Sequence, residues 1–404
     1  MTKISRRALL GTALALPAAG AISNVFGQTR TVQYGVLVPL SGLYARAGTM
    51  MRVGAEMAIA DINASGGIKA LGGAKLELVA LDSGDTTEKA KNAAQRMVAS
   101  YPNLVAASGA YLSSFSLAVT EVTERARLPV LTLSYSELIT SRGFKYVFQT
   151  SAPAGAQAAI TLPMVMQLAQ STTGKRPKTV AIITDNTGSS IASVKAMKEG
   201  LLDQVGLTPL LLETYTPPIT DATWLIQQVR TRRPDLLFFL PTIISDAKLV
   251  LEKMTEFRLH IPTVSFGMAI AEPDVLNTVS PVVLEGLMAA VANWGFKGHE
   301  RLIKRLKEQY HEPWMTQNQI STYGDIWLIK AALENAGVAT REAVAQALHT
   351  MDAGPSIYYP GGRLKFDDKG RREGAQLTII QWQDGVPVTV FPAQLAMATP
   401  RWRQ

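Results

Sequence analysis

Ser113 has a setting that suits a negatively charged ligand. It follows a predicted strand, Leu104–Ala107, and opens a predicted helix, Ser113–Arg125. The first backbone N–H groups of a helix lack acceptors within the helix, and the helix dipole places partial positive charge there. The sequence therefore predicts a carboxylate site at Ser113. The same serine would also serve as an ordinary N-cap of its own helix, and the two roles are compatible.

Other polar and aromatic side chains also follow predicted strands. They are Tyr44 and Arg46 after Val32–Pro39, Ser134 and Ser136 after Pro129–Leu133, Thr187 after Thr179–Thr184, Thr242 after Leu236–Leu240, and Phe266 at the end of Thr263–Phe266. Open α/β sheets bind ligands outside the carboxyl ends of their strands, which makes all of these residues candidate ligand contacts. Arg46 could pair with an anion or point to solvent at the rim of the site. The two serines could instead cap a turn.

Motifs for catalysis and metal binding are absent from the sequence. It contains no cysteine, which excludes disulfides, thiolate metal sites, a cysteine nucleophile and the lipid-modified cysteine of a bacterial lipoprotein. The histidines lack metal-ligand spacing. There is no phosphate loop, dinucleotide glycine motif or nucleophilic serine elbow. The sequence therefore favours a binding protein without a metal or other cofactor over an enzyme.

The charge of the chain is basic but dispersed. Its 404 residues include 40 Lys+Arg and 32 Asp+Glu, for a formal net charge of +8, and 47% of the residues are hydrophobic. The basic residues do not cluster with interleaved aromatic residues, as they do in nucleic-acid binders. We therefore expect a globular protein with substantial cores and no nucleic-acid partner.

The first 27 residues have the three parts of an export signal. A basic start with the pair Arg6-Arg7 precedes an apolar stretch, and small residues come just before Gln28, where cleavage is expected; residues 19–21 are the other candidate site. The arginine pair resembles a twin-arginine signal, but leucine stands where that signal often has phenylalanine, so the Sec route is the alternative. Pro17 interrupts the apolar stretch, which is short for a membrane span of about 20 residues.

After this segment the chain alternates β-rich runs with helical patterns in two successive series. The first series ends near Leu133 and the second runs from Thr179 to Phe266. Residues 290–349 are mainly helical in pattern, and the tail from Gly361 has short strands and turns. Strands separated by such helices imply βαβ units and parallel sheets. We therefore predict an α/β fold of two Rossmann-like lobes with open, mainly parallel sheets and a ligand cleft between them that closes by hinge rotation.

The mature N-terminal block carries many spaced positions of one known pattern. It reads Tyr-Gly-Val-Leu-Val-Pro-Leu-Ser-Gly from Tyr34, then Gly-Ala-Glu-Met-Ala from Gly54 and Asp-Ile-Asn-Ala-Ser-Gly-Gly-Ile from Asp61. Tyr-Gly-Asp from Tyr323 and Phe-Asp-Asp-Lys-Gly from Phe366 follow in order. The chain resembles the leucine/isoleucine/valine-binding family of periplasmic solute-binding proteins of ABC importers over nearly its whole mature length.

The resemblance implies the type I periplasmic binding protein fold, in which three hinge crossovers join two discontinuous lobes. The crossovers are expected near 149–153, 269–273 and 352–358 of this sequence. The expected units are an export signal at 1–27, an N-terminal lobe of 28–150 plus 273–354, and a C-terminal lobe of 151–272 plus 355–404.

The resemblance also implies roles for individual residues. Ser113 falls on the family serine that holds the ligand carboxylate, and Tyr111 falls on a ligand-lining position. Ser134 and Ser136 match positions that complete the carboxylate and ammonium contacts.

One departure from the family concerns the ligand's charge. The family's acidic positions in the second lobe align near Ala154 and Gly267, which are not acidic, and the carboxylates left in the region are Asp185, Asp221, Asp246 and Glu272. An ammonium group buried without an anion is costly. We therefore expect a carboxylate that lacks an α-amine, such as an aromatic or aliphatic acid, with an amide or an amino acid as alternatives.

The function implied by the resemblance is transport. A monomer free of any lipid anchor would capture a small organic solute in the periplasm and deliver it to an ABC permease and its ATPase, which would provide its only contact with the membrane. The alternative is a sensing protein that reports solute occupancy to a regulator or receptor.

The export signal gives the first testable prediction. Fractionation of the native host should recover the protein in the periplasm, with a mature N-terminus near Gln28 by mass spectrometry, because a signal of this kind is removed on export. Full-length protein that stays in the cytoplasm would contradict this expectation.

Overall fold

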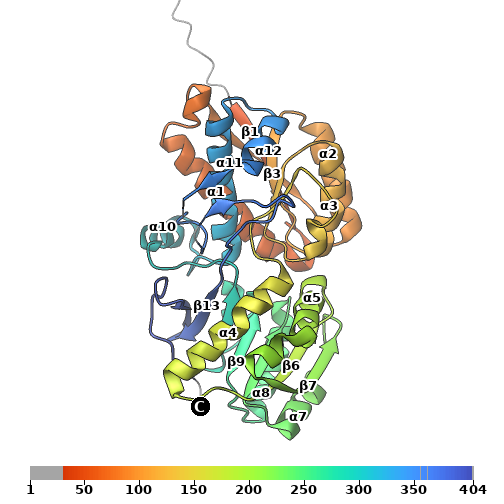
Figure 1. The fold of residues 1–404 in the computed structure, drawn as a ribbon, viewed down its shortest axis with the longest axis vertical. Coiled ribbons are helices and arrows are strands. Elements are labelled where there is room, and N and C mark those ends of the chain that lie inside the picture. Colours follow the sequence, from red (N-terminus) through yellow and green to blue (C-terminus); the bar gives the residue numbers. More distant parts are fainter. Residues whose placement is uncertain (1–30, 355, 362, 403–404) are drawn as a thin grey trace, which may run out of the picture.

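Two lobes, each built around its own β-sheet, make up the computed structural model (Figure 1). It describes residues 31–354, 356–361 and 363–402. The predicted export signal, with its arginine pair and cleavage sites, lies outside the described residues. Among the residues described, no helix is long and apolar enough to span a bilayer.

The first lobe is built mainly from the N-terminal third of the chain. Its elements are β1 (Thr31–Val38), α1 (Ala45–Ala64), β2 (Lys75–Asp82), α2 (Thr87–Ser100), β3 (Leu104–Gly109), α3 (Ser113–Arg125), β4 (Val130–Thr132) and β5 (Val147–Gln149), joined later by α10 (Glu300–Tyr310), α11 (Gln317–Ala336), α12 (Arg341–His349), β11 (Asp352–Ala353) and β12 (Leu364–Lys365). The sheet is parallel, in the order β2-β1-β3-β4-β5, and β11 pairs antiparallel with β12 apart from it.

The second lobe is built from the middle of the chain and its C-terminal end. Its elements are α4 (Ala154–Thr173), β6 (Thr179–Asp185), α5 (Gly188–Ala196), α6 (Leu202–Val205), β7 (Thr208–Tyr215), α7 (Thr223–Arg232), β8 (Leu236–Leu240), α8 (Ile244–Glu256), β9 (Thr263–Phe266), α9 (Pro281–Leu284), β10 (Met288–Val291), β13 (Thr378–Gln383) and β14 (Val386–Phe391). Its sheet has the order β14-β13-β10-β9-β8-β6-β7 and is parallel from β10 to β7, with β13 and β14 antiparallel. The predicted fold class is confirmed.

The chain passes between the lobes at places that partly differ from the predicted ones. The first passage, between β5 and α4, lies where it is expected. The second does not lie at 269–273, because β10 pairs with β9 and keeps the chain in the second sheet as far as Val291. The third does not lie at 352–358, because Tyr359 and Phe366 are buried in the core of the first lobe and the second sheet resumes only at β13.

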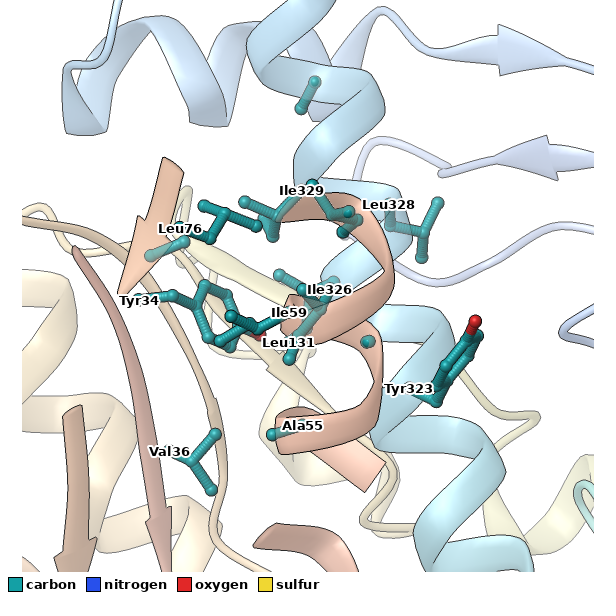
Figure 2. Packing of buried hydrophobic residues seen from close by; sticks show 14 of the residues in the cluster. Tyr34, Val36, Ala55, Ile59, Leu76, Leu131, Tyr323, Ile326, Leu328 and Ile329 are labelled. Atoms are coloured by element: carbon teal, nitrogen blue, oxygen red, sulfur yellow. The ribbon is translucent and has the colours of Figure 1, made fainter. Parts of the chain in front are cut away.

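The core of the first lobe lies mainly between its sheet and the helix pair α1 and α11. Tyr34 and Leu131 from the sheet meet Ile59 of α1 and Ile326 of α11, and all four are buried (Figure 2). The other face of the sheet packs on α2 and α3 through a separate cluster. Such a sheet is buried on both faces, which explains why β1 is nearly continuous in apolar residues rather than alternating.

Gly54 allows α1 and α11 to approach each other closely. A Cβ atom built at Gly54 would lie 2.2 Å from the backbone oxygen of Gln319, in the first turn of α11. That distance is far inside van der Waals contact, and the obstacle is backbone rather than a flexible side chain.

Gly54→Ala should therefore lower the free energy of unfolding by about 1–3 kcal/mol, the usual cost of overpacking a core. Gly354→Ala is the matched control, since a Cβ there meets no atom within 4 Å. Urea unfolding of the three proteins checks this expectation. Equal free energies of unfolding for the two variants would contradict it, and would show that α11 moves to accept the Cβ atom without loss of stability.

Candidate ligand-binding site

A cavity lies between the two lobes, where strands of both sheets end. Its lining is made of Tyr111, Leu112, Ser113, Leu133, Ser134, Tyr135, Gln157, Ser189, Ser190, Ser193, Leu240, Pro241, Thr242, Phe266, Gly267, Met268, Ala269, Gln317 and Asn318. Its volume of about 90 Å³ gives room for several waters or one small ligand. The position agrees with the rule that open α/β sheets bind ligands beyond their carboxyl ends.

Four helices begin at this cavity. The residues concerned are Ser113 of α3, Gln157 of α4, Ser189 and Ser190 of α5, and Gln317 and Asn318 of α11, all in the first turn of their helix. The starts of α3 and α5 carry no side-chain cap, and these two helices face each other across the lobe boundary (Figure 1). The start of α11 carries a capping box, and the N–H of Gly155 in α4 donates to Glu137 at 2.7 Å. The unpaired N–H groups that favour an anion here are therefore those of α3 and α5.

Ser113 is held in place by the loop after β4. Its hydroxyl oxygen accepts a hydrogen bond from the backbone N–H of Ser136 at 3.2 Å. The N-cap position of α3 is Leu112, so Ser113 does not act as the cap of its own helix. Its hydroxyl proton remains available to a ligand in the cavity.

Tyr111 forms a wall of the cavity in an unusual backbone conformation. Its φ of 75° lies in the left-handed region, which is uncommon for residues other than glycine. The hydroxyl of Ser134 donates to its carbonyl oxygen at 2.8 Å and so fixes this turn. Conformations of this kind persist where the surroundings enforce them, often at binding sites.

The remaining sequence-predicted residues divide into two groups. Thr242 and Phe266 line the cavity together with Tyr111, Ser113 and Ser134. Thr187, Ser136, Tyr44 and Arg46 do not line it. Thr187 lies directly behind the lining, since its hydroxyl is hydrogen-bonded to the hydroxyl of Thr242 at 3.0 Å. Direct ligand contact stays a prediction for the lining residues.

Tyr44 supports the site from behind. Its ring centroid lies 5.9 Å from that of Tyr111 and 6.0 Å from that of Phe115. The aromatic side chain expected at the cleft therefore packs on the cavity wall and limits how far Tyr111 can move.

The guanidinium of Arg46 is paired with carboxylates of the protein itself. This corrects the expectation that Arg46 binds a ligand or points to solvent at the rim of the site. Both of its terminal nitrogens donate to the carboxylate of Glu312, at 2.8 and 2.7 Å. Its Nε lies 3.0 Å from Asp274, which precedes a residue of the second lobe's core, Val275. Arg46 therefore joins the first lobe to the second.

The second-lobe carboxylates Asp185, Asp221, Asp246 and Glu272 do not line the cavity. Asp185 accepts hydrogen bonds from the backbone and hydroxyl of Thr187, and Asp246 accepts from the backbone N–H of Ile219. Burial raises the pKa of Asp246 to about 6 and that of Glu272, which lies near Arg46, to about 7. Among the described residues, no acidic or basic side chain lines the cavity.

Several lining residues were not predicted from the sequence, chiefly Tyr135, Gln157, Gln317 and Asn318. A sequence signal for Gln317 and Asn318 as site residues does exist: the run of amide side chains Gln317-Asn318-Gln319 at the start of a helical pattern. Gln157 lies on α4, a helix that the strand–helix rhythm did not reveal.

The model of the family described as "Periplasmic binding protein" matches residues 31–386 of this chain. The chain belongs to this family. Among curated relatives, Leu/Ile/Val-binding protein homolog 8 of Brucella abortus is 26% identical, over 98% of this chain and 99% of its own length. These relatives are solute-binding proteins rather than enzymes.

Solved structures share the fold at lower identity. The branched-chain amino acid binding protein LivJ of Streptococcus pneumoniae, in complex with isoleucine, is 17% identical with a TM-score of 0.75, covering 89% of this chain and 100% of its own. An ABC transporter solute-binding protein of R. palustris in complex with benzoate is 15% identical with a TM-score of 0.74, covering 92% and 99%. Another, from Rhodopseudomonas palustris BisB5 with 3,4-dihydroxybenzoic acid, is 18% identical with a TM-score of 0.71, covering 89% and 96%.

The buried Glu272 gives a prediction about pH. Its pKa of about 7 in the folded protein lies above the ordinary value of 4.5, so the folded state binds the proton more tightly than the unfolded chain does. Stability from this group is therefore present at low pH and is lost as the pH rises from about 4.5 to about 7, by up to about 3 kcal/mol.

Glu272→Gln should flatten the fall in stability between pH 5 and pH 8, because glutamine does not titrate. The control is Glu77→Gln, at an exposed position of β2. Urea unfolding at both pH values provides the comparison. A slope in Glu272→Gln equal to that of the wild type would show that Glu272 does not carry this proton.

Proposed function

We propose that this protein is the substrate-binding component of an ABC importer for a small carboxylic acid that lacks an α-amine. The ligand occupies the cavity between the lobes, and closure of the lobes around it creates the form that docks on a permease and its ATPase. The signal-like N-terminus supports the periplasm as the site of this capture. No chemical change of the solute is part of the proposal.

The observation that carries the proposal is the charge balance of the cavity. The uncapped starts of α3 and α5 bring partial positive charge to it, and no carboxylate of the described residues lines it. A ligand carboxylate would be stabilised by the helix starts and by the Ser113 hydroxyl. A ligand ammonium would be buried without a counter-charge, which is costly.

The structural neighbours show that this fold accommodates such ligands. The proteins from Rhodopseudomonas hold benzoate and 3,4-dihydroxybenzoic acid, whereas LivJ holds isoleucine. The apolar part of the lining, including Leu133, Phe266 and Met268, suits the body of an aromatic or branched aliphatic acid.

Sensing is the second function that this geometry would serve, since lobe closure reports occupancy as well as it prepares transport. The two functions differ in the partner. Loss of solute uptake in a deletion strain whose transcriptional response to that solute is intact supports transport, and the reverse pattern supports sensing.

The proposal predicts how the protein ranks its ligands. By calorimetry, benzoate or an aliphatic acid such as hexanoate should bind more tightly than leucine. Ser113→Ala should weaken the acid by about 1–3 kcal/mol, as expected for the loss of a charge-assisted hydrogen bond to a buried carboxylate. Backbone N–H groups at the start of α3 would retain part of the binding.

Thr123→Val is the matched control, because Thr123 is buried on the same helix and lies outside the cavity lining. Tight leucine binding with no measurable binding of the acids would overturn the proposal, and would mean that one of the second-lobe carboxylates reaches the ligand.

A further inference from the structure

Asn318 is a buried polar side chain without a partner. It is the second residue of α11, it lines the cavity, and it is fully buried. Neither its side-chain oxygen nor its side-chain nitrogen has a hydrogen-bond partner among the described residues. An amide presents one acceptor and two donors, so this group needs a partner that can both donate and accept.

Tyr135 shows the same feature in the same cavity. It follows β4, between Ser134 and Ser136, and it also lines the cavity. Its hydroxyl oxygen is buried, and the side chain of Gln317 lies near it, but within the part of the chain that the structure describes it makes no hydrogen bond of standard geometry. Two uncompensated polar groups therefore belong to one small site.

Such groups are unfavourable for the protein alone. Buried polar atoms in native proteins are nearly always hydrogen-bonded, because an unmet donor or acceptor loses its water without compensation. Leucine and phenylalanine have the same branching as Asn318 and Tyr135 and would not carry that cost. Polar groups that cost stability and line a binding cavity are expected where the ligand supplies the missing partners.

The ligand group that fits is neutral. A second carboxylate would only accept hydrogen bonds and would leave the Asn318 oxygen unmet. An ammonium would only donate, would leave the Asn318 nitrogen unmet, and would find no carboxylate in the lining. A hydroxyl group both donates and accepts hydrogen bonds. It can therefore donate to the oxygen of Asn318 and, at the same time, accept from the amide of Asn318 or the hydroxyl of Tyr135.

We infer that the solute carries a neutral hydroxyl group in addition to its carboxylate, and that Asn318 and Tyr135 select for this hydroxyl. The inference rests on the proposed function for the carboxylate. It narrows the substrate class to hydroxylated carboxylic acids and makes these two residues determinants of specificity.

Matched pairs of acids test the inference directly. The probes are benzoate against 3- and 4-hydroxybenzoate, and hexanoate against 6-hydroxyhexanoate, measured by calorimetry on the full mature chain. In at least one pair the hydroxylated acid should bind at least about tenfold more tightly, because a site built to bond a hydroxyl discriminates strongly against its absence.

Two variants assign the preference to its residues. Asn318→Leu and Tyr135→Phe should each reduce the preference for the hydroxylated acid severalfold while changing the affinity for the plain acid little. Thr161→Val is the control, since Thr161 has a buried, unpartnered hydroxyl on α4 but does not line the cavity. It should leave the preference unchanged.

Thermal unfolding without ligand separates ligand selection from a structural role. Asn318→Leu should melt at the same temperature as the wild type or higher, because it removes an unmet polar group. A lower melting temperature together with an equal loss of affinity for both members of a pair would show a structural role and overturn the inference.

The outcomes also distinguish this inference from the proposed function. Binding of the plain and hydroxylated acids with equal affinity in every pair would overturn the inference alone, and would mean that water meets Asn318 and Tyr135. Binding of leucine but none of the acids would overturn the proposed function. A hydroxyl preference that survives in both variants would show that other residues select the hydroxyl.

Discussion

The structure depends on the convergence of two uncapped helix starts on one cavity between the lobes, and no charged side chain of the described residues lines this cavity. The starts of α3 and α5 approach from opposite lobes, so a Cβ built at Gly188 would lie 4.0 Å from that of Ser113. Two such ends repel each other weakly unless an anion lies between them. Under the proposed function, closure of the lobes and binding of a carboxylate would be the same event, since the ligand would supply the charge that lets the two helices face each other.

Several carboxylates near the boundary between the lobes bind other protein groups and do not line the cavity. Glu312 and Asp274 both bind Arg46, which connects α1 to the second lobe. Asp185 binds Thr187, whose hydroxyl is hydrogen-bonded to that of the lining residue Thr242. A lobe-joining ion pair and an ammonium site would compete for the same acidic groups. Glu312 and Asp274 serve the first purpose, and the polar side chains among the described lining residues are hydroxyls and amides.

Much of the fold could be predicted from the sequence where the signal is local. The helix Ser113–Arg125 and the strand Leu236–Leu240 have the bounds that their apolar patterns predict. The strand β10 was missed, since it has only four residues and is defined by pairing with β9 and β13. The ion pairs of Arg46 could not be predicted from local sequence either, because its partners lie more than 200 residues further along the chain. The absence of a second-lobe carboxylate from the cavity agrees with the sequence, because it follows from residue types at aligned positions. The lack of a hydrogen-bond partner for Asn318 among the described residues depends on how several segments pack around it. A local sequence pattern does not contain that information.

The most direct test of the central claim is the identity of the solute that the protein carries from its own host. Protein purified from the native periplasm without added ligand would be denatured, and the released small molecules would be identified by mass spectrometry against a matched blank. The charge balance of the cavity predicts a carboxylic acid without an α-amine, released unaltered and in near-stoichiometric amount. Leucine, isoleucine or valine as the released solute would contradict it.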